Sequence, residues 1–193
     1  MDDIKRIKEI FQSSANLKQQ LANDDAFIAL CAKAANMMVT CFKNDGKVLF
    51  CGNGGSAADA QHLSAELSGR FYKDRDPLFS EALHVNTSYL TAVANDYSYD
   101  QIYSRLVKAK CRKGDVLVGI STSGNSKNII LALEEAKKQK SLTIGFTGES
   151  GGLMKDICDI CFCIPSSDTP RIQEAHIVLG HTLCELVELN YFA

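Results

Sequence analysis

A glycine-rich turn followed by a helical segment carries the residues best suited to chemistry in this sequence. Gly52-Asn53-Gly54-Gly55-Ser56 follows a strand-like run, and the pattern beyond it predicts a helix over 56–68. Glycines at such a junction let backbone N–H groups approach a ligand, and a helix N-terminus favours an anion. His62 and Glu66 lie four residues apart on this helix and so share one face. The segment predicts a cradle for a small polar molecule, with a base or a pair of metal ligands beyond it.

A second candidate loop is rich in hydroxyl groups. Ser121-Thr122-Ser123-Gly124-Asn125-Ser126 follows an apolar run, and a helix is predicted to begin near Ser126. Hydroxyls, a glycine and a helix N-terminus can surround a phosphate without Lys or Arg. The alternative is an ordinary capped turn, because Ser and Asn are common N-cap residues. A cap needs only one or two of the six residues, which favours phosphate binding.

Neither loop matches a standard nucleotide-binding motif. The second loop has no Gly-Lys-Ser/Thr signature of a P-loop, and the first lacks the third glycine of a dinucleotide fingerprint.

The last helical segment holds three further reactive candidates, Gln173, His176 and His181. Gln173 and His181 are eight residues apart, roughly 80° around a helix, and can line the same side of a cleft. Taken alone, each histidine is more often a structural group, and His62 and Glu66 could equally form a simple surface pair.

The elements that must position these residues form an α/β pattern. Fully apolar strands separated by helices indicate a mainly parallel five-stranded sheet covered on both faces. Strands are predicted over 47–51, 82–85, 116–120, 142–146 and 160–164. Besides 56–68, helices are predicted over 87–94, 100–109, 126–138, 153–156 and 171–190.

Two further helices precede the sheet. Apolar residues recur at helical spacing through the first 43 residues, and the second helix is expected from Asp25 to Lys43 with Asp24 or Asp25 near its cap. Both are too long and apolar for a mere tail. We expect them to pack on the α/β unit or on another subunit.

Length and charge limit the classes of function. The 193 residues fit one domain, 1–193, and 21 basic against 23 acidic residues give a formal charge of −2. This balance argues against a general nucleic-acid or membrane-surface binder. The charged N-terminus lacks the apolar core of a signal peptide, and we find no uninterrupted apolar stretch of membrane-spanning length. A cytoplasmic protein is the simplest expectation.

Cysteine usage fits that expectation. Five of the eight cysteines sit singly among apolar neighbours, as buried reduced thiols do, and without a secretory signal we expect no disulfides. Cys158 and Cys161 have the spacing of half a zinc knuckle, but no second pair follows at finger spacing. The run 160–164, which includes Cys163, is better interpreted as a short buried strand.

Taken together, these motifs resemble those of one family. The order Gly52-Asn53-Gly54-Gly55-Ser56, His62-x3-Glu66, Asn95-Asp96, Ser121–Ser126 and Arg171-Ile172-Gln173-Glu174-x-His176-x4-His181 resembles that of the bacterial phosphoheptose isomerases, members of the sugar-isomerase (SIS) domain superfamily. The resemblance covers essentially the whole chain. Each motif alone is unspecific, whereas their combination is specific.

The resemblance implies a single α/β three-layer sandwich domain and a homotetramer with active sites at subunit contacts. It places the substrate phosphate on Ser56, Ser121, Thr122, Ser123 and Ser126. It places the sugar near Asn53, Gly54, Gly55, Glu66, Asn95, Asp96 and Gln173. In members that carry zinc, the ligand positions match His62, Glu66, Gln173 and His181, one Zn²⁺ per subunit. The acid–base roles fall on Glu66 and His181, and Asp168 matches no functional motif.

The implied reaction converts sedoheptulose 7-phosphate to D-glycero-D-manno-heptose 7-phosphate, the first step toward the ADP- or GDP-heptoses of bacterial lipopolysaccharide or capsule. It needs a base near the sugar carbons and a group that moves protons between oxygens, and Glu66 and His181 can take these roles in either order.

The motifs leave two alternative functions. One is a non-catalytic SIS protein like the regulator associated with the bacterial replication initiator, which lacks the acid–base pair. The other is isomerisation of a shorter sugar phosphate, although no regulatory domain of the usual arabinose-5-phosphate isomerase layout is appended.

Overall fold

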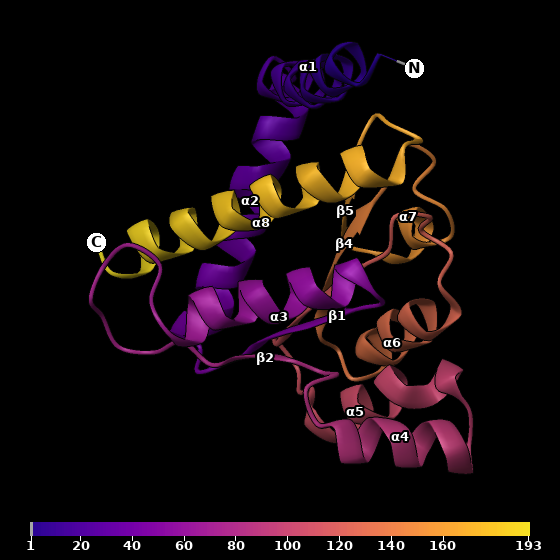
Figure 1. Cartoon of the computed structure of the whole chain (residues 1–193). Helices are drawn as coiled ribbons and strands as arrows, with labels where there is room; N and C mark the ends of the chain where they lie inside the picture. Colours follow the sequence, from indigo (N-terminus) through magenta and orange to yellow (C-terminus); the bar gives the residue numbers. More distant parts are fainter. Residues whose placement is uncertain (1) are drawn as a thin grey trace.

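The predicted strands form one parallel sheet in the computed structural model, which describes residues 2–193. The strand order is β2-β1-β3-β4-β5, and every neighbouring pair is parallel (Figure 1). The strands are β1 (Val48–Gly52), β2 (Ser80–Ala82), β3 (Val116–Ile120), β4 (Leu142–Thr147) and β5 (Ile160–Cys163). The prediction of a mainly parallel five-stranded sheet is confirmed.

Helices cover both faces of this sheet. Successive side chains of a strand point to opposite faces, so Val48 and Phe50 of β1 pack on one side and Leu49 and Cys51 on the other. The first side is covered by α2 (Asp25–Lys43), α3 (Gly55–Ser68) and α8 (Thr169–Tyr191). The second side is covered by α4 (Thr87–Asp96), α5 (Ile102–Lys110), α6 (Lys127–Lys138) and α7 (Met154–Ile157). The result is the expected three-layer α/β sandwich.

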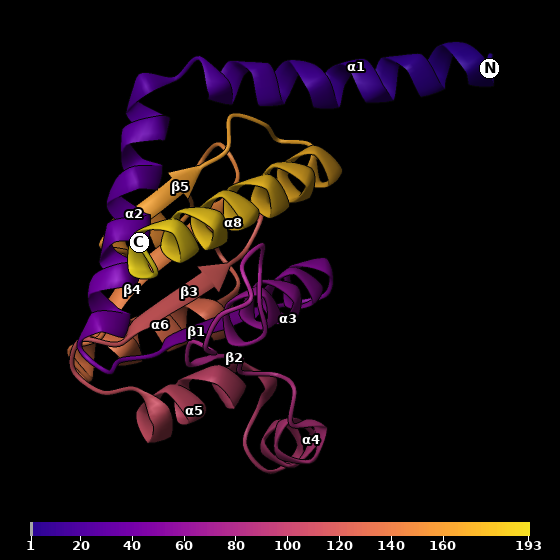
Figure 2. The ribbon, with the colours of Figure 1, turned by 90° about the vertical axis from the view of Figure 1, so that its left-hand side faces the viewer.

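The two N-terminal helices have different surroundings. Asp24 is the N-cap of α2 and accepts hydrogen bonds from the backbone N–H groups of Ala26 and Phe27, both at 3.0 Å. Helix α1 (Asp3–Ala22) buries only Leu17 and Leu21, near its C-terminal end. Figure 2 shows the rest of α1 extending away from the sheet.

Helix α2 is long and apolar enough, by length and composition, to span a membrane, with a mean hydropathy of 1.4. Its apolar side is occupied in the fold: Ala34, Ala35 and Met38 are buried against the sheet and α8. The composition of α2 therefore reflects core packing.

Several boundaries differ from the sequence prediction, most of them by one or two residues. The strand expected over 82–85 is β2, Ser80–Ala82; at the edge of the sheet β2 has one neighbour, so Ser80 and Glu81 can pair with β1 although they are polar, while Val85 is 45% exposed. A 3-10 turn, η1 (Tyr99–Gln101), replaces the first residues of the helix expected over 100–109. Helix α8 begins two residues early, with Asp168 as its N-cap.

The parallel strands bring both candidate loops to one edge of the sheet. Gly52 at the end of β1 is in register with Ile120 at the end of β3, and Ile120 with Phe146 of β4. Ligands of open α/β sheets bind at this carboxyl edge. The first loop and the serine loop (Ser121–Ser126) are therefore neighbours.

Candidate active site

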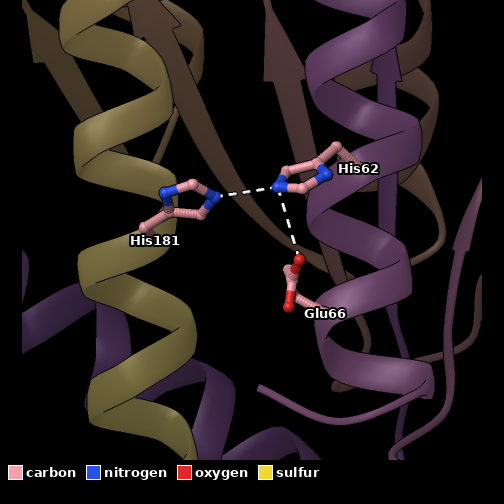
Figure 3. Close-up of side chains that lie close together, drawn as sticks. All are labelled: His62, Glu66 and His181. Atoms are coloured by element: carbon pink, nitrogen blue, oxygen red, sulfur yellow. Dashed lines mark hydrogen bonds and ion pairs between the residues drawn. The ribbon is translucent and has the colours of Figure 1, made fainter. Parts of the chain in front are cut away.

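Three side chains from two helices meet above the sheet. His62 and Glu66 extend from α3, and His181 extends from α8 toward them (Figure 3). The Nε2 atoms of His62 and His181 are 2.8 Å apart, and His62 Nε2 lies 3.3 Å from Oε1 of Glu66. Residues 119 positions apart in sequence thus form one acid–base cluster.

Close packing brings α3 beside α8. A Cβ on Gly180 would collide with the side chain of Leu63, so the two helices approach at a position that tolerates no side chain. His181 follows Gly180 directly, and Leu63 follows His62. The close approach therefore sits beside the pair of imidazoles.

A buried ion pair fixes the other ends of these helices. Glu188 of α8 is 2% exposed and accepts hydrogen bonds from the backbone N–H groups of Phe71, Tyr72 and Lys73 and from Nε of Arg75. Burial acts to raise the pKa of Glu188, but these donors outweigh it, and the pKa is lowered. Arg75 Nη2 also donates to the carbonyl of Glu66 at 2.8 Å. The helix that carries the candidate base is thereby anchored to α8.

A fourth ionisable group lies beside the cluster. Burial raises the pKa of the Asp59 carboxyl above its ordinary value, against the opposing effect of His62 and His181. Its buried Oδ2 has no hydrogen-bond partner within the described residues. The His62 side chain is 49% exposed and that of Glu66 is 23% exposed, so the cluster opens to solvent on one side of the chain.

The cluster could hold a metal ion. Within residues 2–193, His62, Glu66 and His181 form the one group of three His, Cys, Asp or Glu side chains whose ligand atoms all lie within 4.8 Å of one another. Ligands about 2.0–2.1 Å from a tetrahedral zinc would be about 3.3 Å apart. The His62–Glu66 distance matches this separation, and the two imidazoles would need to separate by about half an ångström. The eight cysteines, including Cys158, Cys161 and Cys163, are free thiols.

The serine loop is arranged differently from a capped turn. Ser126 occupies the N-cap position of α6, yet its side chain makes no cap hydrogen bond. Its Oγ lies 2.9 Å from Oγ of Ser121, and Ser121 Oγ is 3.4 Å from that of Ser123. The backbone N–H of Gly148, after β4, donates to the carbonyl of Thr122 at 2.9 Å and fixes the loop. Three neighbouring hydroxyls at a helix start without a side-chain cap suit a phosphate.

The first loop is built around Gly54 and Asn53. Gly54 has φ of 56°, a conformation that favours glycine, and it directs the chain into α3. Ser56, in the first turn of α3, is 4% exposed. The Asn53 amide pairs with that of Asn128, and Asn53 Oδ1 accepts a hydrogen bond from the Tyr99 hydroxyl.

The remaining predicted residues lie around these loops. Gln173 directs its amide at the first loop, with Nε2 2.6 Å from where a Cβ on Gly55 would lie. It is about 12 Å along α8 from His181. Asn95 and Asp96 end α4 on the other side of the sheet and hydrogen-bond to each other at 3.0 Å. Asp168 begins α8 without a side-chain cap bond.

Sequence reasoning missed several residues of this region. Asp59 lies three residues before His62 on α3, so its helical spacing was a usable signal. The sequence around Asn128, Tyr99 and Arg75 carried no such signal, because each contacts residues that are distant in sequence.

Relatives in sequence and structure agree with these motifs. The family model described as SIS domain matches residues 9–148. Phosphoheptose isomerase 2 of Campylobacter jejuni is 50% identical over 186 residues, which are 96% of this chain and 92% of that protein.

Two solved structures share the fold at similar coverage. A phosphoheptose isomerase of Francisella tularensis has a TM-score of 0.93 and 38% identity, over 98% of this chain and 100% of that one. That of Neisseria gonorrhoeae has a TM-score of 0.90 and 42% identity, over 96% and 98%. The chain belongs to the phosphoheptose isomerase family of SIS-domain proteins.

Proposed function

We propose that this protein is an aldose–ketose isomerase that converts sedoheptulose 7-phosphate to D-glycero-D-manno-heptose 7-phosphate, the first step of ADP- or GDP-heptose biosynthesis. The observation that carries the proposal is the cluster of His62, Glu66 and His181, two of which lie on α3, the helix that begins at the first loop beside the serine loop. Relatives of about half identity that are named phosphoheptose isomerases support a phosphoheptose substrate.

The reaction needs two coordinated proton transfers. A base removes a proton from C1 of the ketose, which gives an enediol, and an acid returns a proton to C2 while the hydroxyl proton is transferred from the C1 oxygen to the C2 oxygen. Glu66 and His181 are close enough to His62 to exchange protons through one connected set of atoms. We assign the acid–base roles to these two residues.

The two loops hold the unreactive parts of the substrate. Ser56, Ser121, Thr122, Ser123 and Ser126 bind the phosphate, which supplies remote binding energy and positions the reacting end. Asn53, Gly54, Gly55, Asn95, Asp96 and Gln173 bind the sugar. The uncapped start of α6 supports the phosphate assignment.

The same residues suit a zinc ion. His62, Glu66 and His181 would hold it, and Gln173, whose amide is directed at Gly55, would have to turn toward the cluster to serve as a fourth ligand. The ion, when bound, would polarise the sugar carbonyl as a Lewis acid. The spacing of the three clustered donors supports this assignment.

We also propose that the chain is one domain that assembles as a cytoplasmic homotetramer, with sites at subunit contacts. Ile4, Ile7 and Phe11 of α1 are 68%, 55% and 74% exposed, which is costly unless another surface covers them. A second subunit would also shield the exposed side of His62 from water. Free thiols in all eight cysteines fit a reducing compartment.

A binding-only SIS regulator is not favoured. Such a protein lacks the acid–base pair, whereas Glu66 and His181 are both present and meet at His62. The relatives above are isomerases by name.

The direct test is turnover. Purified protein, with and without added Zn²⁺, is incubated with sedoheptulose 7-phosphate in D₂O and followed by NMR, because an enediol path carries solvent deuterium to C2. Five- and six-carbon ketose phosphates are run in parallel. Absence of the heptose aldose product under both metal conditions would reject the function, and faster turnover of a shorter ketose would reject the substrate.

Two variants test the assigned roles. Glu66→Gln or His181→Ala should lower kcat at least about a hundredfold, because general acid–base catalysis contributes about 10²–10⁴-fold. Glu134→Gln, an exposed position on α6, is the matched control and should keep wild-type turnover. Full activity in both active-site variants would remove Glu66 and His181 from the mechanism.

A further inference from the structure

Asn53 of the first loop is held by two residues that neither the sequence motifs nor the assigned roles include. Asn53 Nδ2 donates to Oδ1 of Asn128, and Asn128 Nδ2 donates back to Oδ1 of Asn53, both at 2.9 Å. The hydroxyl of Tyr99 donates to the same Asn53 Oδ1 at 3.1 Å.

These three hydrogen bonds leave the Asn53 side chain with one unused hydrogen-bonding group. A primary amide has two N–H donors and two acceptor positions on its oxygen. The oxygen of Asn53 is filled by Asn128 and Tyr99, and one N–H is used by Asn128. What remains is a single N–H, which can donate to an oxygen and accept nothing.

The positions of the two partners connect the separate parts of the site. Asn128 is 3% exposed and is the second residue of α6, directly behind the serine loop. Tyr99 begins the turn that follows Asn95 and Asp96 at the end of α4. Asn53 is therefore held both to the start of α6, directly behind the serine loop, and to the turn that follows α4.

The backbone beside Asn53 is fixed too. The hydroxyl of Tyr103, 1% exposed, donates to the carbonyl of Gly52. Asn128 and Tyr99 in turn restrict the rotation of the Asn53 side chain.

We propose that Asn128 and Tyr99 are positioning residues that lock Asn53 as a one-hydrogen donor to an oxygen of the sugar, at a fixed separation from the bound phosphate. The inference rests on the proposed isomerase function. It predicts that the two residues govern affinity for the sugar portion while leaving the phosphate site and the proton transfers intact.

The experiment compares two variants with a matched control. Asn128→Asp keeps the shape but has no N–H donor, so a carboxylate oxygen faces Asn53 Oδ1 and the amide must turn. Tyr99→Phe removes only the third hydrogen bond. The control is Tyr97→Phe, two residues away, whose ring stacks with Arg105. Each protein is assayed for kcat and KM with sedoheptulose 7-phosphate and for competitive inhibition by inorganic phosphate.

One misplaced neutral hydrogen bond corresponds to about a 2- to 10-fold change in affinity. KM should rise about threefold in Tyr99→Phe and about tenfold in Asn128→Asp, with kcat within about twofold of wild type. The phosphate inhibition constant should stay within about twofold of wild type in Tyr99→Phe, which adds no charge. Tyr97→Phe should match wild type throughout. A loss of general structure would instead weaken phosphate inhibition as well.

Either of two results overturns the proposal: an unchanged KM in both variants, or a parallel rise of KM and the phosphate inhibition constant in Tyr99→Phe. If Asn128→Asp does not fold by circular dichroism, Tyr99→Phe decides, because its altered side chain is half exposed. Wild-type turnover is measured first; its absence rejects the isomerase function, and the positioning role falls with it.

Discussion

At the scale of residues, His176 and His181 of α8 have opposite environments although they are five positions apart. His181 reaches the open cluster with His62, whereas His176 is 0% exposed and directs Nε2 to the carbonyl of Thr147 at 3.1 Å. Burial lowers the pKa of His176 to about 4, partly offset by that carbonyl. His176 is therefore neutral and structural, and it ties α8 to the end of β4.

This burial makes His176 a source of acid sensitivity. Its pKa is about 4 in the fold against 6.5 for an unperturbed histidine, so between these values the unfolded chain binds more protons. Its stabilisation is complete above pH 6.5 and is lost as the pH falls toward 4. His176→Gln can still donate to Thr147 but does not titrate. We expect wild type to lose on the order of 3 kcal/mol more than the variant between pH 7.5 and pH 4.

Urea unfolding at several pH values, at one protein concentration, checks this expectation. All other titratable groups are the same in the two proteins, so the difference in slope reports His176. Parallel pH profiles would show that His176 does not resist protonation in the fold.

At the scale of elements, the close approach of α3 and α8 decides whether the imidazoles meet. Glycine is a weak helix former, yet Gly180 lies inside α8, where Leu63 leaves no room for a Cβ. Glycine at this position lowers the helix propensity of α8 but allows α3 to approach closely. The Arg75–Glu188 pair holds the same two helices at their other end.

Gly180→Ala should therefore destabilise the protein, although alanine favours helix by about 1 kcal/mol. Overpacking in a tight interior costs about 1–3 kcal/mol, and the helices must separate or Leu63 must leave its rotamer. We expect a lower free energy of unfolding in urea, together with lower turnover. The double variant with Leu63→Ala checks the cause: Leu63→Ala should cost less in the Gly180→Ala background than in wild type. Strictly additive effects would contradict the clash.

At the scale of the whole molecule, most of α1 is not packed against the rest of the chain. Its last two turns pack by Leu17 and Leu21, and the rest of the helix extends away from the sheet (Figure 2). Ile4, Ile7 and Phe11 form an exposed apolar stripe along that part. A largely apolar groove of about 400 Å³ lies between α1, α2 and α8. It is lined in part by Phe27, Ile28 and Val178. These surfaces suit contacts between copies of the chain.

Replacing Phe11, the most exposed residue of the stripe, tests this view. Phe11→Asp should lower the molar mass measured by light scattering after size exclusion below that of a tetramer, because a buried unpaired carboxylate is costly at an interface. Asn16→Asp, on the opposite face of α1, adds the same charge and should leave the mass unchanged. A tetramer in Phe11→Asp, or a monomeric wild type, would contradict the role of the stripe.

The parts that could be predicted from sequence are those with a local cause. The apolar runs that became β3 and β4, the Asp24 cap and the glycine turn at Gly54 depend on residues close by in the chain. The edge strand β2 was misplaced because pairing with β1, rather than its own apolarity, determines which residues extend. Asn128 and Tyr99 were missed because their partner, Asn53, lies 75 and 46 residues away.

The sequence by itself determined the parallel α/β class, the two ligand loops and, through the order of its motifs, the family. Apolar strands, turn residues and helix N-termini depend on residues close together in the chain, and the order of the motifs can be compared directly between sequences. Only the tertiary structure decided that His181 meets His62 while His176 does not, and that the Asn53 amide keeps one free donor. The first outcome depends on how closely α3 and α8 approach on one face of the sheet, and the second on the contact between the first loop and α6. Side chains that are distant in sequence set both contacts.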